Sequence, residues 1–193
     1  MSRCSRCSTG SAALRRPWSS LAGPHHIGRR ADGAARLHTP HLPGRQGDGL
    51  HTAVQTSGFL GDRADESYLS AIDLVLLDIK SSDPDTYRRV TGRDLAPTLR
   101  FAERLASLSK PVWVRFTLVP GETDDPANVE GIARFVAPMQ NVEWVEVQPF
   151  HQMGEFKWKA MNLEYKLANT EPPTKHLVNR VLGQFRDAGC RVR

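Results

Sequence analysis

Two oppositely charged side chains, Asp78 and Lys80, follow an unbroken apolar run and have the types and spacing to do chemistry. The run is Leu74–Leu77, and Ser81-Ser82-Asp83-Pro84 comes after the pair. Because side chains alternate along a strand, Asp78 and Lys80 share one side of it. In α/β folds, ligands bind at the carboxyl ends of buried parallel strands. The alternative is structural, with an exposed strand-end lysine and an aspartate that caps the next turn.

Polar side chains also stand near the carboxyl ends of the other expected strands: Gln55, Thr56, Arg115, Thr117 and His151. In a barrel or part-barrel of parallel strands, these ends meet at one mouth. Convergence of such residues with Asp78 and Lys80 is therefore expected. It is the strongest indication of a site that the residue pattern alone provides.

The elements that must position these residues alternate between strand and helix, four times, in units of about 30 residues. This pattern predicts an α/β fold of parallel strands with right-handed crossovers. The expected strands are 50–56, 73–80, 111–119 and 142–147, with a short final strand at 190–193. The expected helices are 63–70, 83–89, 97–108, 127–137 and 174–188, and 152–170 is expected to be irregular. Trp113, Trp144 and Phe116 are expected in the core.

The composition of the 193 residues is that of an ordinary soluble domain, with 39% hydrophobic and 24% charged residues. No apolar run reaches the roughly 20 residues that span a bilayer. Residues 1–50 carry eight arginines and neither lysine nor glutamate, so the net charge of +5 says little about the partners of the rest. Three cysteines give no disulfide framework, which indicates a reducing, cytoplasmic setting.

Residues 1–48 do not have the pattern of a folded domain and are expected to be irregular, non-native or disordered. A partial β/α barrel domain is expected over 49–193. Cys4 and Cys7 form a lone Cys-x2-Cys and are the candidate metal ligands of the chain. A zinc site normally needs two further ligands, and the histidines of this segment match no established spacing.

Several short motifs occur together, in order, between residue 49 and the end of the chain. They are Gly49-Leu50-His51-Thr52, Thr56-Ser57-Gly58-Phe59, Leu77-Asp78-Ile79-Lys80, Val112-Trp113-Val114-Arg115, Val119-Pro120-Gly121, Asp124-Asp125, Pro149-Phe150-His151, Gly154, Lys157-Trp158 and Leu163-Glu164-Tyr165-Lys166-Leu167. With these motifs, the chain resembles the pyruvate formate-lyase activating enzymes. These are radical S-adenosylmethionine (SAM) proteins that install a glycyl radical in a partner enzyme.

The resemblance implies a partial (β/α)6 barrel, of which this chain has the C-terminal portion. It implies SAM and a [4Fe–4S] cluster held by a Cys-x3-Cys-x2-Cys loop. Reductive cleavage of SAM gives a 5′-deoxyadenosyl radical, which abstracts hydrogen from a glycine of the partner. The implied partners are a glycyl-radical enzyme of the pyruvate formate-lyase type and an electron donor such as flavodoxin or ferredoxin, without nucleic acid or membrane.

The resemblance also implies roles for individual residues. Asp78, Lys80 and His151 fall at positions beside SAM, and Arg115 falls near its carboxylate or the partner peptide. Thr56 and Asp78 fall where the family builds a small cation site, although Gln55 stands where the family usually has aspartate. Lysine and arginine suit a carboxylate, and a neutral histidine can hydrogen-bond to an adenosine group.

The sequence departs from the family in its first 48 residues. The Cys-x3-Cys-x2-Cys loop and the Gly-Gly-Glu segment are absent, and Cys4 and Cys7 supply two of the three cluster ligands. One hypothesis is that this segment is translated in a shifted frame, because suitable codons for 35–49 and for 18–23 would encode family-like sequence. The codons of the gene test this hypothesis.

The sequence leaves three hypotheses about function. The first is a glycyl-radical activating enzyme. The second is a non-enzymatic remnant that keeps part of the SAM wall and cannot cleave SAM by itself. The third is a barrel hydrolase or aldolase with Lys80 as a Schiff-base lysine, against which the other motifs argue. A part-barrel without its first strands would also expose a sheet edge, which predicts poor solubility.

Overall fold

The computed structural model describes residues 51–193, which belong to the compact unit Arg36–Arg193. Four strands form one parallel sheet in the order β1-β2-β3-β4. They are β1 Ala53–Thr56, β2 Leu74–Asp78, β3 Val112–Leu118 and β4 Val142–Pro149. The α/β class and the four expected strands are confirmed, with ends that differ by up to three residues. Parallel neighbours in chain order require a crossover between each pair of strands.

Five of the six α-helices in 51–193, all except α5, begin where the sequence places proline or a capping side chain. Asp83 accepts a hydrogen bond from the Thr86 N–H at the start of α2, and Asp125 caps α4 in the same way. The α-helices are α1 Glu66–Ser70, α2 Pro84–Thr91, α3 Ala96–Ser107, α4 Pro126–Val136, α5 Glu155–Ala160 and α6 Lys175–Asp187. The 3₁₀ turns are η2 Gly61–Arg63 and η3 Gln152–Gly154.

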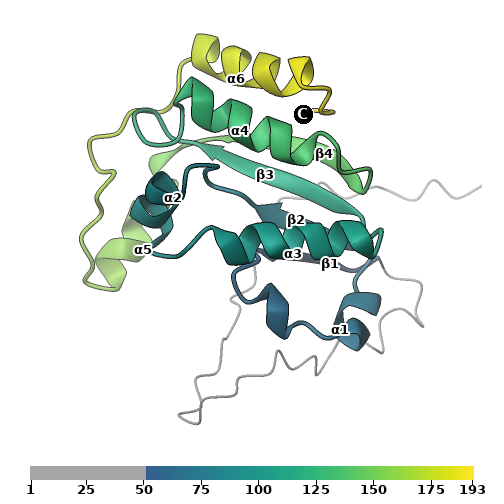
Figure 1. Cartoon of the computed structure of the whole chain (residues 1–193). Helices are drawn as coiled ribbons and strands as arrows, with labels where there is room; N and C mark the ends of the chain where they lie inside the picture. Colours follow the sequence, from purple (N-terminus) through teal and green to yellow (C-terminus); the bar gives the residue numbers. More distant parts are fainter. Residues whose placement is uncertain (1–50) are drawn as a thin grey trace, which may run out of the picture. The chain divides into compact units, whose positions relative to one another are not determined.

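The hydrophobic core lies between the sheet and one layer of helices. Figure 1 shows α3 and α4 lying along the same face of the sheet, and α6 beside α4. Every second residue of β3 faces this core, and the Phe116 ring meets the Phe185 ring of α6 edge-on, with centroids 5.9 Å apart. The expected core position of Phe116 is confirmed.

The other face of the sheet is polar and aromatic. Trp113 and Trp144 lie side by side here, because they pair in register on β3 and β4. Arg193 lies 4.0 Å from the Trp113 ring centroid, and Arg191 lies 4.8 Å from that of Trp144. The expectation that the two tryptophans are core residues was wrong, because alternation places them opposite the helices.

The segment that closes the chain joins the sheet, as expected. Val192 forms a parallel bridge with Val145 of β4, and the Val145 N–H donates to the Arg191 carbonyl at 2.8 Å. The stretch 152–170 is less irregular than expected, because it contains η3 and α5. Helix α5 has no inward apolar stripe, since Phe156 is 65% and Trp158 41% exposed. That missing periodicity is why the sequence pattern did not predict it.

Candidate functional site

A chain of hydrogen bonds connects three strands at the carboxyl edge of the sheet. The Lys80 Nζ lies 3.1 Å from Asp78 Oδ1 and 2.8 Å from Thr117 Oγ1, and the Gln55 Nε2 lies 3.1 Å from Asp78 Oδ2. We call these four residues the polar edge. The sequence prediction that Asp78 and Lys80 share one side is confirmed by their contact.

The local sequence explains this arrangement. Asp78 is the last residue of β2 and follows an apolar strand that is buried between its neighbours. Its side chain is only 13% exposed, so the flanking Gln55 amide and Lys80 ammonium satisfy the two carboxylate oxygens where water has little access. The Lys80 side chain is 30% exposed. The Lys80 ammonium can therefore present its charge to a ligand while its hydrogen bonds to Asp78 and Thr117 hold it in place.

Arg115 is the neighbour of Asp78 on the next strand, but its side chain bonds to Glu146 rather than to Asp78. In register, Asp78 of β2 pairs with Arg115 of β3, and Arg115 pairs with Glu146 of β4. The Arg115 Nε lies 3.0 Å from a Glu146 oxygen, and Arg193 approaches the same carboxylate at 3.7 Å. Arg115 therefore belongs to a row of ion pairs, Arg115–Glu146–Arg193, on the polar face of the sheet beside the polar edge.

Two other residues singled out from the sequence lie apart from these bonds. The Thr56 Oγ1 accepts a hydrogen bond from the Gly58 N–H at 3.0 Å, and Thr56 pairs in register with Leu77 rather than with Asp78. His151 is exposed and stands at the start of η3, after β4. The small cation site at Thr56 and Asp78 and the SAM contact of His151 remain predictions.

Gln55 is the member of the polar edge for which the sequence indicated no specific role. It was expected among the polar side chains that converge at the strand ends, and it was noted as a departure from the family. Its position next to Asp78 follows from the pairing of β1 with β2, which a single sequence does not specify. Thr117 was expected at a strand end, and its bond to Lys80 depends in the same way on the pairing of β2 with β3.

Metal ligation was tested on the part of the chain that the structure describes. Within 51–193, no group of three or more His, Cys, Asp or Glu side chains is placed to hold a metal ion. Cys190 is the one cysteine in this range, and burial raises the pKa of its thiol, which disfavours the thiolate that a metal needs. The described residues therefore do not fit an iron–sulfur cluster. The candidate ligands Cys4 and Cys7 lie outside this range.

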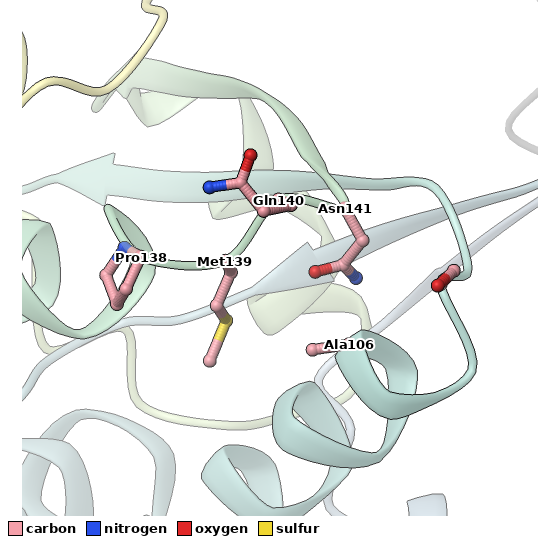
Figure 2. Close-up of a pocket in the computed structure, with 6 residues that line it drawn as sticks. Ala106, Pro138, Met139, Gln140 and Asn141 are labelled. Atoms are coloured by element: carbon pink, nitrogen blue, oxygen red, sulfur yellow. The ribbon is translucent and has the colours of Figure 1, made fainter.

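Two surface hollows lie away from the polar edge. A hollow of about 480 Å³ is found near the starts of β3 and β4, where Asn141 and Met139 point into it (Figure 2). The buried Oδ1 of Asn141 has no hydrogen-bond partner. A second hollow of about 380 Å³ lies between Pro120 and the segment Asn169–Thr174. Neither is lined by a residue of the polar edge.

The sequence of the chain matches a known protein family. Residues 24–135 match the family model described as the radical SAM superfamily. The chain is 37% identical over 147 residues to the pyruvate formate-lyase 1-activating enzyme of Escherichia coli K12, covering 75% of this chain and 60% of that protein. It is 38% identical over 137 residues to the pyruvate formate-lyase-activating enzyme of Staphylococcus epidermidis, covering 68% and 55%. The chain thus spans about three fifths of these relatives.

Solved structures support the fold. A domain of a pyruvate-formate lyase-activating enzyme from Bacteroides vulgatus superposes with a TM-score of 0.62 at 19% identity, covering 79% of this chain and 85% of that one. A radical SAM methyltransferase from Sphaerobacter thermophilus superposes with a TM-score of 0.50 at 18% identity, covering 73% and 39%. The sheet and its helices are therefore a segment of the radical SAM barrel. None of the helices in 51–193 is long and apolar enough to cross a membrane.

Proposed function

The chain belongs to the radical SAM superfamily, and from this premise we propose that its polar edge binds SAM in an enzyme that activates pyruvate formate-lyase. The observation that carries the proposal is the Gln55–Asp78–Lys80–Thr117 chain of bonds at the carboxyl edge of the barrel sheet. The names of the relatives from Escherichia coli and Staphylococcus epidermidis support the same activity.

The polar edge has the donors and acceptors that SAM requires. SAM carries a carboxylate, an ammonium and a sulfonium, so it needs both a cation and an anion from the protein. Lys80 uses two of its three N–H donors on Asp78 and Thr117, which leaves one for the SAM carboxylate. The Asp78 carboxylate supplies negative charge for the cationic groups. We propose that His151 contacts SAM, that Arg115 lies near the SAM carboxylate or the partner peptide, and that Thr56 and Asp78 hold a small cation.

Radical cleavage of SAM needs a source of electrons in addition to the residues that bind SAM. In the superfamily, a [4Fe–4S] cluster supplies the electron that cleaves SAM. The residues in 51–193 do not fit that cluster, so we assign them binding and orientation of SAM and no radical step. The same observation favours a second candidate, a non-enzymatic remnant of the barrel that keeps the SAM wall.

Partners follow from the proposed activity. The polypeptide substrate would be an enzyme of the pyruvate formate-lyase type, and flavodoxin or ferredoxin would supply the electron. We propose a cytoplasmic location and assign no role to nucleic acid or membrane.

The binding proposal predicts that Lys80→Met weakens SAM binding by the whole chain about tenfold, the value of one lost charge-assisted hydrogen bond. Isothermal titration calorimetry measures this affinity. Lys175→Met is the matched control, because Lys175 is an exposed lysine of α6, and it should leave the affinity unchanged. Equal affinities for wild type and Lys80→Met would reject the role of Lys80.

Iron content separates the two candidate functions. The whole chain is reconstituted anaerobically with iron and sulfide, and an EPR spectrum of the reduced protein is recorded with and without SAM. About four irons per chain, as one [4Fe–4S] cluster requires, with a spectrum that SAM changes and a glycyl radical on added pyruvate formate-lyase, would support the enzyme. Tight SAM binding without stoichiometric iron would support the remnant.

A further inference from the structure

A buried amide, Asn128 of α4, bonds to the loop that follows Lys80. Asn128 is only 6% exposed. Its Oδ1 accepts hydrogen bonds from the Ser81 Oγ at 2.6 Å and from the Ser82 N–H at 2.8 Å, and its backbone carbonyl accepts from the Ser82 Oγ at 2.8 Å. Three bonds thus fix the two residues directly after Lys80 to the start of one helix.

The same amide also fixes the end of β3. The Asn128 Nδ2 donates to the Thr123 carbonyl at 2.8 Å, and the Thr123 Oγ1 donates to the Thr117 carbonyl at 2.8 Å. Since Thr117 accepts the bond from Lys80, these contacts close a ring that runs from Lys80 through Thr117, Thr123 and Asn128 to Ser81. The Asn128 side chain thus bonds both to the loop after Lys80 and to Thr123, whose hydroxyl bonds to the Thr117 carbonyl.

A second, independent feature keeps α4 close to this loop. A Cβ atom on Gly131 would lie 2.3 Å from the Ser82 Oγ and 2.8 Å from the Ser82 Cβ. Real Cβ atoms do not come so close, so any larger residue would displace Ser82. Helix α4 thus has glycine at a position where Ser82 of the loop after Lys80 packs directly on it.

We infer that Asn128 is a positioning residue of the polar edge, which holds the loop after β2 so that the Lys80 ammonium stays between Asp78 and Thr117. Its action on SAM binding rests on the proposed function, whereas its action on Lys80 does not. Asn128 would thus preorganise the Lys80 ammonium for binding a carboxylate. A lysine held in place loses less side-chain freedom when a carboxylate binds to it.

The first measurement needs no ligand. The whole chain is labelled with acetic anhydride, and mass spectrometry gives the labelling rate of Lys80 relative to the exposed Lys175. In Asn128→Ala and in Gly131→Ala, Lys80 is expected to label several-fold faster, because its ammonium is no longer held by both Asp78 and Thr117. Asn141→Ala is the control, because it also loses an amide bond, the one to the Lys110 carbonyl, at the opposite ends of the strands.

The second measurement is the SAM affinity of the same variants. Asn128→Ala and Gly131→Ala should each bind SAM about tenfold more weakly than the wild type. Asn141→Ala should bind SAM like the wild type. Faster Lys80 labelling together with a wild type that binds no SAM would support positioning and reject the proposed function. Unchanged Lys80 labelling in folded Asn128→Ala overturns the inference. Where Asn128→Ala does not fold, Gly131→Ala decides in the same way, because alanine favours its helix.

Discussion

The carboxylate of Asp73 ties the beginning of β2 to the residue before β1. It accepts hydrogen bonds from the Thr52 N–H at 2.6 Å and from the Thr52 Oγ1 at 2.8 Å. The backbone hydrogen bond from Thr52, and then the side-chain bond from the same residue, lower the pKa of Asp73 below its ordinary value of 3.8. The ionised form is therefore favoured in the folded chain.

This shift predicts how stability depends on acid. Because the pKa of Asp73 is lower in the folded than in the unfolded chain, the unfolded chain binds the proton first as the pH falls. The stabilisation is complete above pH 3.8 and is lost as the pH falls through the lower folded value. Urea unfolding of wild type and Asp73→Asn, measured from pH 6 down to about pH 2, should show a smaller pH dependence in the variant.

Asp62→Asn provides the control for this experiment. Asp62 pairs with Arg100 in an ion pair whose two side chains are 59% and 55% exposed, and such pairs contribute little to stability. The acid dependence of this variant should match that of the wild type. An acid dependence of Asp73→Asn equal to that of the wild type would show that the Thr52 bonds do not matter for stability.

At the scale of single residues, alternation along one strand was enough to predict that Asp78 and Lys80 share a side. Their contact partners Gln55 and Thr117 come from neighbouring strands, so their identity depends on strand register. Register is a tertiary property, set by how the apolar sides of several strands pack together. The same limit applies to Arg115, whose partner Glu146 lies on β4.

Among the elements, η2 packs on α3 with almost no space. A Cβ on Gly61 would lie 2.2 Å from two ring atoms of Phe101 and 2.6 Å from its Cβ, and Phe101 is 4% exposed in the core. Gly61→Ala is therefore expected to destabilise the chain by about 1–3 kcal/mol, the usual cost of overpacking. Urea denaturation followed by circular dichroism measures the change.

Gly183 of α6 is the matched position. A Cβ there would meet no atom within 4 Å, so Gly183→Ala adds only helix propensity and should stabilise the chain by about 0.5–1 kcal/mol. The two substitutions are chemically identical and are expected to have opposite signs. Equal effects at both positions would contradict the packing of η2 on α3.

The elements were predictable from sequence where an apolar period and a capping residue coincide. Asp83 and Asp125 each precede a proline, and the helices that follow them begin at those prolines. Helix α5 has neither an inward apolar stripe nor such a start, so its sequence looked irregular. Trp113 and Trp144 show the converse error, because large apolar side chains were assumed to face the core.

For the molecule as a whole, the pattern of four strand–helix units was sufficient for the α/β class and the parallel order. Alternation along each strand determines which side of β3 and β4 carries the apolar set that packs on the helices of 51–193. This alternation was not applied to Trp113 and Trp144 when they were expected in the core. The domain boundary at residue 48 and the metal ligands Cys4 and Cys7 stay predictions, because they lie outside the residues that the structure describes.

The edge of the sheet at β1 determines how copies of the chain should behave toward one another. Of the strands in 51–193, β2 alone pairs with β1, and Ala53 and Gln55 are exposed on it. A strand with a free edge is a template for pairing with another chain. The expected result is concentration-dependent self-association, measured by sedimentation velocity.

Two substitutions identify the surface responsible. Ala53→Lys places a charge on the β1 edge and should shift the chain toward monomer, as charged edge strands do in natural proteins. Met153 is 72% exposed and lies outside the sheet, so Met153→Lys tests apolar contact through the segment after β4 and should leave self-association unchanged. Rescue by Met153→Lys alone would assign self-association to that segment. A wild-type monomer that stays monodisperse and melts cooperatively would show that the β1 edge is not available for pairing in the whole chain.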